Sequence, residues 1–345
     1  MKLHQYKVLV VGPSWIGDMV MAQCLFQSLH QQINNLHLSV LAPEWSIPLV
    51  KRMPEVNTAI PTPFKHGRFS IRDRLEIARQ LRSENFNRAI VLPRSLKSAI
   101  VPFLANIPTR TGFLGEKRYG LINDVRKIDK KELPRTVDQF VHLGSSAQKP
   151  SSLKKFRPAL QTKPGEKNKI FDRLGLPLSD KPALAICPGA AFGPAKRWPI
   201  EKFAEVARLQ LEKGWQIWLM GSNEDSTLTK EISDLALNDI YDLAGRTKLE
   251  EAVDLLSSAS YVVSNDSGLM HVAAAVDTPI IAIYGSTSPR INPPLSSQAT
   301  VLWKNLSCSP CNQQACPLVH TDCLQKLDVN CITDVLSTYK PSSLR

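Results

Sequence analysis

The stretch that decides the fold runs from Tyr261 to Gly285, YVVSNDSGLMHVAAAVDTPIIAIYG. An apolar run, Tyr261–Val263, is typical of a short buried strand, and the polar turn Ser264–Gly268 breaks it. Residues Leu269–Val276 favour a helix, and a second apolar strand is expected at Ile280–Ile283 after a Pro-containing turn. The stretch therefore predicts one tight β-α-β unit whose helix begins beside the carboxyl edge of a sheet.

The start of that helix is a candidate anion site. A helix N-terminus presents unpaired N–H groups and the positive end of a dipole, and Asp266, Ser267 and Gly268 lie there. The small Ser and Gly residues would let a phosphate approach the backbone. The alternative is that Asp266 or Ser267 only caps the helix and that His271 is an ordinary helix histidine. Taken alone, the stretch leaves both interpretations open.

Length and composition set the class of protein. The 345 residues favour two domains, and 43% hydrophobic with 21% charged residues is ordinary for a soluble globular protein. No run reaches the roughly 18 to 20 apolar residues that span a bilayer, and the N-terminus lacks a signal-peptide pattern, so we expect a cytoplasmic protein. A net charge of +12 predicts a polyanionic partner: nucleic acid, a phosphorylated metabolite or an anionic membrane surface. Seven cysteines, an odd number, favour reduced thiols over a disulfide framework.

The N-terminal half predicts an open, mostly parallel α/β sheet. An apolar strand, Lys7–Val11, leads into a glycine-bearing loop that ends at Asp18, and a helix is expected over Met19–Gln31. The loop lacks the glycine spacing of a dinucleotide fingerprint and the Lys-Ser/Thr of a Walker loop, so nicotinamide or ATP chemistry gains no support. Asp18 is either a first-turn acid that favours the helix dipole or a group that faces a ligand.

Basic residues are frequent between Phe64 and Tyr119. Those at helical spacing fit a solvated helix face. Others lie in or beside loops that follow strands, where α/β sheets bind ligands. We expect part of this second set to meet an anionic ligand; its members are Arg94, Lys97, Arg110, Lys117 and Arg118.

A polar segment from about Asp124 to Lys181, with one helix expected near Thr136–Leu143, marks a domain boundary. A second α/β series then begins with the strand Ala183–Cys187. The loop after this strand is rich in glycine and small residues and ends in Lys196-Arg197 before a helix. It can admit and neutralise a phosphate, or it is a long connection with a surface Lys-Arg pair.

The next strand of this series ends near Asp225, which could bond a ribose hydroxyl or serve as a first-turn acid. The sequence thus predicts two α/β domains, each with a loop of small residues after its first strand. We expect a ligand to bind between them. Lys196 and the groups around Ser267 and His271 would bind phosphate, and Asp18 would act from the other side. That division suits group transfer from an activated diphosphate donor.

Three motifs resemble the heptosyltransferase family of GT-B glycosyltransferases: VGPSWIGDMVM at 11–21, CPGA with GPAKRWP at 187–199, and NDSGLMHVAAA at 265–275. The resemblance runs from about residue 7 to 290. It implies an α/β fold of two facing Rossmann-like domains with parallel sheets and an interdomain cleft. The acceptor-binding domain would be 1–165 and the ADP-heptose-binding domain 166–328. A C-terminal helix, 329–345, would pack back on the first domain.

The resemblance also implies the chemistry. L-glycero-D-manno-heptose would pass from ADP-heptose, with inversion and without a metal or other cofactor, to the first heptose of the lipopolysaccharide inner core. Asp18 would be the catalytic base, and Lys196 would stabilise the departing ADP. The implied donor-binding residues are Lys196, Asp225, Asp266, Ser267, Gly268, Leu269 and His271.

The five loop cations would meet the Kdo-containing, heptosylated lipid A acceptor. Its lipid would hold a cytoplasmic enzyme, expected to be a monomer, peripherally at the anionic inner face of the inner membrane.

The C-terminal part departs from the family pattern. It holds one C-x2-C pair, Cys308 and Cys311, followed by Cys316 and Cys323. A single such pair is a weaker zinc signal than two. We expect a structural loop and no catalytic metal, with a bound metal or a redox-sensitive pair as the alternative.

Other functions remain open at this point. Heptosyltransferase I or another ADP-heptose-using transferase would share these motifs, and a sugar-nucleotide epimerase or an inactive binding module would share the cleft. A nucleic-acid-binding protein would explain the charge. However, the sequence has no RNP, zinc-finger or helix-turn-helix signature, and its basic residues lack interleaved stacking aromatics, so we expect no nucleic-acid partner.

Overall fold

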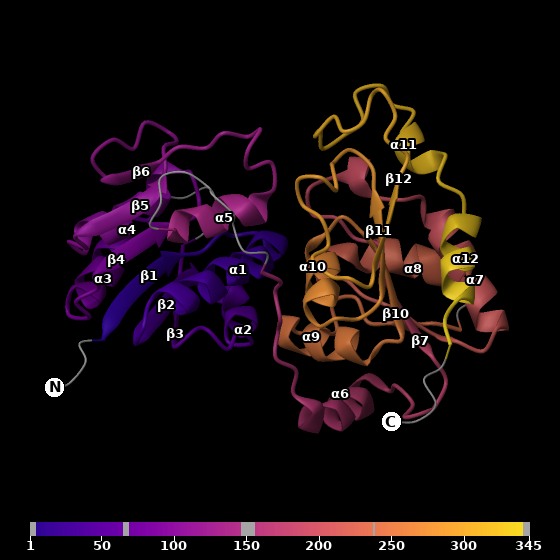
Figure 1. Ribbon diagram of the computed structural model, residues 1–345. Helices are drawn as coiled ribbons and strands as arrows, with labels where there is room; N and C mark the ends of the chain where they lie inside the picture. Colours follow the sequence, from indigo (N-terminus) through magenta and orange to yellow (C-terminus); the bar gives the residue numbers. More distant parts are fainter. Residues whose placement is uncertain (1–4, 65–68, 146–155, 237–238, 341–345) are drawn as a thin grey trace. The chain divides into compact units, whose positions relative to one another are not determined.

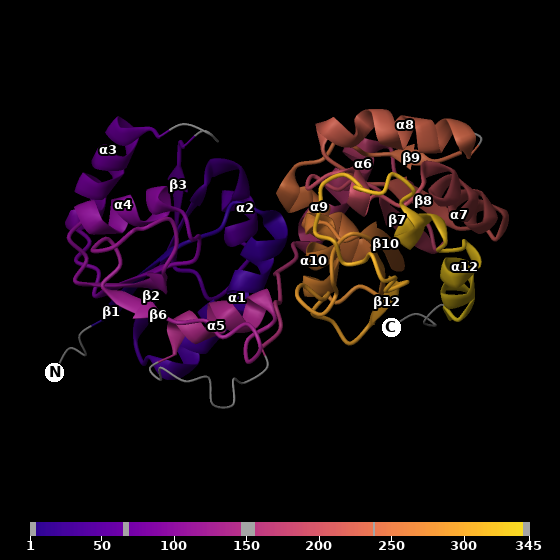
Figure 2. The same cartoon turned by 90° about the horizontal axis from the view of Figure 1, so that it is seen from above.

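The computed structural model describes residues 5–64, 69–145, 156–236 and 239–340. The chain divides between Ala159 and Leu160 into two compact units. Each unit is an α/β layer structure in which helices cover a sheet (Figures 1 and 2). Residues 146–155 of the expected boundary segment and 341–345 of the expected C-terminal helix lie outside the described residues.

The first unit contains a six-stranded sheet in the order β3-β2-β1-β4-β5-β6. Every strand pairs in parallel with its neighbours. Its strands are β1 (Tyr6–Val11), β2 (Leu36–Pro43), β3 (Thr58–Thr62), β4 (Arg88–Val91), β5 (Thr109–Phe113) and β6 (Asp124–Arg126). Its helices are α1 (Ile16–Gln32), α2 (Ile47–Val50), α3 (Ile71–Arg82), α4 (Leu96–Leu104) and α5 (Thr136–Gly144).

The second unit repeats this plan with a six-stranded parallel sheet in the order β12-β11-β10-β7-β8-β9. Its strands are β7 (Ala183–Cys187), β8 (Gln216–Leu219), β9 (Tyr241–Asp242), β10 (Tyr261–Asn265), β11 (Ile280–Tyr284) and β12 (Ala299–Trp303). Its helices are α6 (Lys167–Leu174), α7 (Ile200–Glu212), α8 (Ser226–Leu235), α9 (Leu249–Ser258), α10 (Gly268–Ala275), α11 (Asp322–Gln325) and α12 (Asn330–Ser337).

The central strands are apolar because helices cover both faces of each sheet. Val8, Leu9 and Val10 of β1 have no exposed surface, and all five residues of β7 are buried. On one face of the first sheet the core is formed with α3 and α4, and α1 packs against α5. The predicted α/β class with parallel sheets is thereby confirmed for both units.

Strand order places a topological switch point in each sheet. In the first unit the chain builds outward from β1 in one direction and from β4 in the other, and in the second it does so from β7 and from β10. Ligands of open α/β sheets bind beside the carboxyl ends of such strand pairs. The register Ser264↔Cys187 brings the loops after β10 and β7 to the same edge, and Val11↔Val91 does so for β1 and β4.

The predicted β-α-β unit is confirmed, with β10, α10 and β11 within two residues of the expected bounds. The polar segment from Asp124 to Lys181 holds more structure than its sequence suggested, because β6 adds an edge strand and α6 packs on α9. Leu160 N–H bonds to Ala275 O at 3.0 Å, and Lys163 N–H bonds to Asp254 Oδ1 at 2.8 Å. These bonds place residues 160–165 in the second unit, although the sequence interpretation assigned them to the first domain.

The described part of the expected C-terminal helix is α12, which packs on α7 within the second unit. Its expected packing on the first domain stays a prediction. Ile332 and Leu336 of α12 are 0% and 2% exposed in the core that α7 and β7 share, so their apolar face is already covered there. Among the described helices, none is long and apolar enough to cross a bilayer.

Candidate active site

Asn265 fixes the geometry of the switch point in the second unit. Its side chain has no exposed surface and lies at the end of β10. Nδ2 donates to Pro188 O at 2.6 Å, and Oδ1 accepts the Trp198 N–H at 3.1 Å. Both ends of the loop after β7 are therefore held against the start of α10, and Lys196 lies between them.

Lys196 and Asp266 form a buried ion pair at this edge. Lys196 Nζ lies 2.6 Å from Asp266 Oδ2, and the two side chains are 12% and 4% exposed. Thr287 Oγ1 donates to the same carboxylate oxygen at 2.5 Å. Lys196 Nζ also lies 5.0 Å from the centre of the Phe192 ring. Asp266 therefore does more than hold a turn, because it fixes the Lys196 ammonium at the mouth of α10.

The first turn of α10 is arranged as an anion site would require. Ser267 is the N-cap residue with an extended backbone, and it makes no side-chain cap bond to the helix. Its Oγ lies 3.3 Å from Ser264 Oγ. Ser267, Gly268 and Leu269 are half-buried, whereas the residues on either side of them are buried. The first turn of α10, whose backbone N–H groups have no partner within the helix, is therefore partly exposed close to the Lys196 ammonium.

His271 is a neutral group in this site. It is 5% exposed, and burial lowers its pKa to about 4, with the Lys196 charge lowering it further and Asp266 opposing the change. The imidazole is therefore uncharged near pH 7. It can contribute a hydrogen bond to a diphosphate but not a positive charge.

Asp225 serves as a helix cap. It belongs to a capping box in which its Oδ2 accepts the Ser222 N–H at 2.9 Å and the Ser222 hydroxyl at 2.8 Å. A Cβ atom added at Gly189 would overlap the Asp225 carboxylate, so only glycine allows this close approach. Asp225 therefore lies directly beside the loop after β7. These bonds show that it caps the first turn of its helix.

The switch point of the first unit contains a hollow of about 370 Å³. We call it the first-unit hollow. Its walls come from the loops after β1 and β4, from β2 and from α3. Its polar lining residues are Ser14, Thr62, Arg74, Ser95, Lys97, Ser98 and Glu116. Of the five loop cations expected at an acceptor site, Lys97 lies in this hollow.

Asp18 lies close to the same edge. It is half-buried in the first turn of α1, directly after the loop Gly12–Trp15. The residue before that helix, Trp15, is 57% exposed. The position of Asp18 is favourable with the helix dipole, and the residue is partly exposed.

Two expected acceptor residues, Arg118 and Arg110, bond to neighbouring loops. Arg118 is 1% exposed and donates to Pro93 O at 2.7 Å and to Ser98 Oγ at 3.0 Å. Burial lowers its pKa to about 10. Arg110 Nε donates to Leu121 O at 2.8 Å, and its NH1 donates to a further backbone carbonyl. Both guanidinium groups brace loops; Arg118 is buried, whereas Arg110 is half-buried and keeps some exposed surface.

The other two loop cations are exposed. Arg94 NH2 donates to Gln139 Oε1 at 2.9 Å, and its guanidinium lies 5.4 Å from the centre of the Phe113 ring. Lys117 lies in a loop with a positive φ of 51°. These two residues therefore remain available at the surface of the first unit.

Sequence reasoning missed three contributors to these sites. Arg74 is 5% exposed over the Phe64 ring at 4.0 Å and lines the first-unit hollow, yet its position within a helix gave no signal. Glu116 caps α4 by accepting the Leu96 N–H at 2.7 Å. Thr287 follows β11, which lies beside β10, so the predicted β-α-β unit could have placed it near Asp266.

The two doubly wound units, with a reachable helix N-terminus in one and a polar hollow in the other, place the chain in the GT-B class of α/β glycosyltransferase folds. The profile of glycosyltransferase family 9 (heptosyltransferase) matches residues 74–321, and the chain belongs to this family.

Individual relatives agree with this assignment. The chain is 46% identical to lipopolysaccharide heptosyltransferase 2 of Salmonella typhimurium over 306 residues, which are 86% of this chain and 87% of that protein. It is similar to the solved structure of Escherichia coli ADP-heptose lps heptosyltransferase II, with a TM-score of 0.80, 38% identity and coverage of 95% and 99% of the two chains. Lipopolysaccharide heptosyltransferase 3 of E. coli is more distant, at 25% identity over 79% of this chain and 80% of that protein.

Proposed function

We propose that the chain is an ADP-heptose:lipopolysaccharide heptosyltransferase II, which adds L-glycero-D-manno-heptose to the first heptose of the inner core. The observation that carries the proposal is the Lys196–Asp266 pair at the start of α10, held at 2.6 Å beside accessible helix N–H groups. The higher identity to heptosyltransferase 2 (46%) than to heptosyltransferase 3 (25%) favours this acceptor over that of the more distant relative.

The donor diphosphate would bind at the first turn of α10. Its oxygens would accept hydrogen bonds from the N–H groups of Ser267, Gly268 and Leu269, while Lys196 supplies a positive charge and His271 a neutral hydrogen bond. Asp266 would hold Lys196 in place. Asp225, beside Gly189, would accept a ribose hydroxyl in addition to its capping role.

Transfer would then take place in one displacement. Asp18 accepts the proton of the acceptor hydroxyl while the hydroxyl oxygen forms a bond to the anomeric carbon of the donor. The bond from that carbon to ADP breaks on the opposite face. The electron pair leaves with ADP, whose added negative charge Lys196 and the α10 N–H groups stabilise. These groups suffice for the step without a divalent metal.

The acceptor would use the first-unit hollow. Lys97 would meet the anionic groups of the Kdo-bearing, heptosylated lipid A, with Arg94 and Lys117 on the surrounding loops. Arg74, which donates to Lys97 O at 2.8 Å, would add positive charge to the wall of the hollow. The net charge of +12 would favour association with an anionic membrane face, which suits a cytoplasmic, peripherally bound enzyme. We propose a monomer as the working unit.

Asp18→Asn tests the proposed reaction. We expect kcat for heptose transfer to fall by about 10²- to 10⁴-fold, the usual contribution of a general base, with little change in the Kd for ADP-heptose. Glu201→Gln, which changes a first-turn acid of α7, should leave both values near those of the wild type. Transfer at the wild-type rate by Asp18→Asn would refute the role of Asp18, and donor turnover without any acceptor would favour an epimerase.

A further inference from the structure

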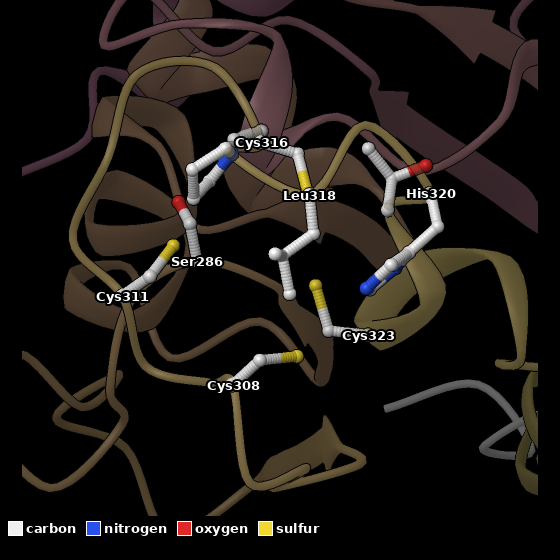
Figure 3. Close-up of a pocket in the computed structure, with 10 residues that line it drawn as sticks. Ser286, Cys308, Cys311, Cys316, Leu318, His320 and Cys323 are labelled. Atoms are coloured by element: carbon white, nitrogen blue, oxygen red, sulfur yellow. The ribbon is translucent and has the colours of Figure 1, made fainter.

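Four cysteines gather in a place that the proposed reaction does not use. Cys308, Cys311, Cys316 and Cys323 line one cavity of about 30 Å³ in the second unit, next to His320 and Ser286. Figure 3 shows their side chains arranged around this cavity. All four are half-buried, free thiols. The space suits a single ion or one or two waters.

The segment that carries these cysteines lacks an apolar core of its own. Between β12 and α11, residues 304–321 form no helix or strand, and Ser309 is the one buried residue among them. The half-buried residues of this segment are Leu306, Cys308, Cys311, Cys316 and Thr321. Buried apolar surface normally offsets the entropy cost of ordering a chain, and this segment buries almost none. Apart from a few hydrogen bonds, such as Ser309 Oγ to Gly285 O at 2.7 Å, the cysteines are the groups available to hold it.

The same segment supports the donor site. Gln314 O accepts the Ala195 N–H at 3.0 Å, and Asn312 N–H donates to Ser286 O at 2.7 Å. Ala195 precedes Lys196 and Ser286 precedes Thr287, the two residues that bond the Asp266 carboxylate. Ordering of the cysteine segment would therefore fix both partners of Asp266.

We propose that Cys308, Cys311, Cys316 and Cys323 bind one structural Zn²⁺ ion as thiolates. The four cysteines follow the spacing C-x2-C-x4-C-x6-C. Zn²⁺ prefers a set of four sulfur ligands, whereas Mg²⁺ and Ca²⁺ prefer oxygen ligands. Among the described residues, no three of these side chains already converge as metal ligands, so binding requires the thiols to rotate inward to Zn–S distances of about 2.3 Å.

Binding of Zn²⁺ by the four cysteines requires no oxidant or reductant. Four Zn–S bonds form, the four thiols release up to four protons to solvent, and no electron is transferred. The metal site is independent of the heptosyl-transfer reaction, whereas its effect on the donor site rests on the proposed function.

Metal analysis of the full chain tests the proposal. The protein, purified under reducing conditions, should contain one zinc per chain by mass spectrometry of the elements. Cys308→Ser/Cys311→Ser should retain less than about a tenth of that zinc, because two of four ligands are gone. The matched control is Cys331→Ser, another half-buried cysteine that lies in α12 and outside the cavity, and it should keep the metal.

Two further measurements use the wild-type protein, so that the test does not depend only on whether the variants fold. Co²⁺ added to zinc-stripped wild type should give the thiolate charge-transfer and d–d bands of tetrahedral sulfur coordination. A chelator should lower the Tm of the wild type but leave that of Cys308→Ser/Cys311→Ser unchanged. Wild type that holds no zinc and shows no such cobalt bands would overturn the proposal, as would an intact mass showing a disulfide between these cysteines. Zinc-loaded protein that does not bind ADP-heptose would refute the donor-site function and leave the metal site standing.

Discussion

The two switch points use their positive charges in different ways. In the first unit, Lys97 and Arg74 line a hollow of about 370 Å³. In the second, Lys196 is 12% exposed and paired with Asp266 at 2.6 Å. An open hollow can accept a branched, multiply charged acceptor in several poses. A cation fixed by a buried carboxylate would suit a single group, and in the proposed reaction that group is the diphosphate, whose charge changes.

Lys196→Ala should give the largest effect. It leaves the Asp266 carboxylate buried and without its cation, with a hydrogen bond from Thr287, so the free energy of unfolding should fall by about 3 kcal/mol or more. Transfer should slow by about 10²-fold or more, because a charge that stabilises the leaving group is lost. Urea unfolding and a steady-state transfer assay measure the two losses.

The double variant Lys196→Met/Asp266→Asn separates these losses. Removal of both charges should restore most of the stability, because no unpaired charge stays buried, whereas transfer should stay slow. If Lys196→Ala alone transfers heptose at the wild-type rate, the contrast between the two switch points disappears.

His271 should make the second unit sensitive to acid. Its folded pKa of about 4 lies below the ordinary value of 6.5, so the unfolded chain binds more protons between these pH values. The stability that the neutral imidazole contributes is fully present above pH 6.5 and is lost as the pH falls toward 4. The expected loss is about 3 kcal/mol at most. Urea unfolding of His271→Gln from pH 7 to 4 should show a correspondingly weaker pH dependence, and an identical pH profile would contradict this account.

Lys97→Ala should have a smaller effect that is confined to the acceptor. We expect the acceptor KM to rise about tenfold, with the Kd for ADP-heptose unchanged, because one partly solvated charge contact is lost. The effect should shrink as salt increases. Lys51→Ala, an exposed lysine of the same unit, is the control and should change neither constant. If the Kd for ADP-heptose changes instead, the proposal that the first unit binds the acceptor and the second unit binds the donor is wrong.

Local patterns predicted those parts of the molecule that depend on neighbouring residues. The strand, turn and helix at 261–276 were found because apolar periodicity and turn residues lie side by side in the sequence. The first-turn position of Asp18 followed from the strand and helix that flank it. The small-residue motifs also indicated the GT-B class.

Long-range contacts could not be predicted in this way. Arg118 is one of five similar loop cations in the sequence, and its burial depends on Pro93 and Ser98, which lie 25 and 20 residues away. Lys196 and Asp266 are 70 residues apart, and their pairing depends on the position of β7 beside β10. The packing of α12 on α7 was not predicted, because an apolar helix face does not specify its partner.

The most direct test of the proposed function is to offer the enzyme ADP-heptose with two acceptors, Kdo2-lipid A without heptose and its mono-heptosylated form. Mass spectrometry of the products then shows which acceptor gains a heptose. The proposed function predicts extension of the mono-heptosylated acceptor and none of the heptose-free one. Extension of the heptose-free acceptor alone would contradict it and would assign the chain to heptosyltransferase I activity.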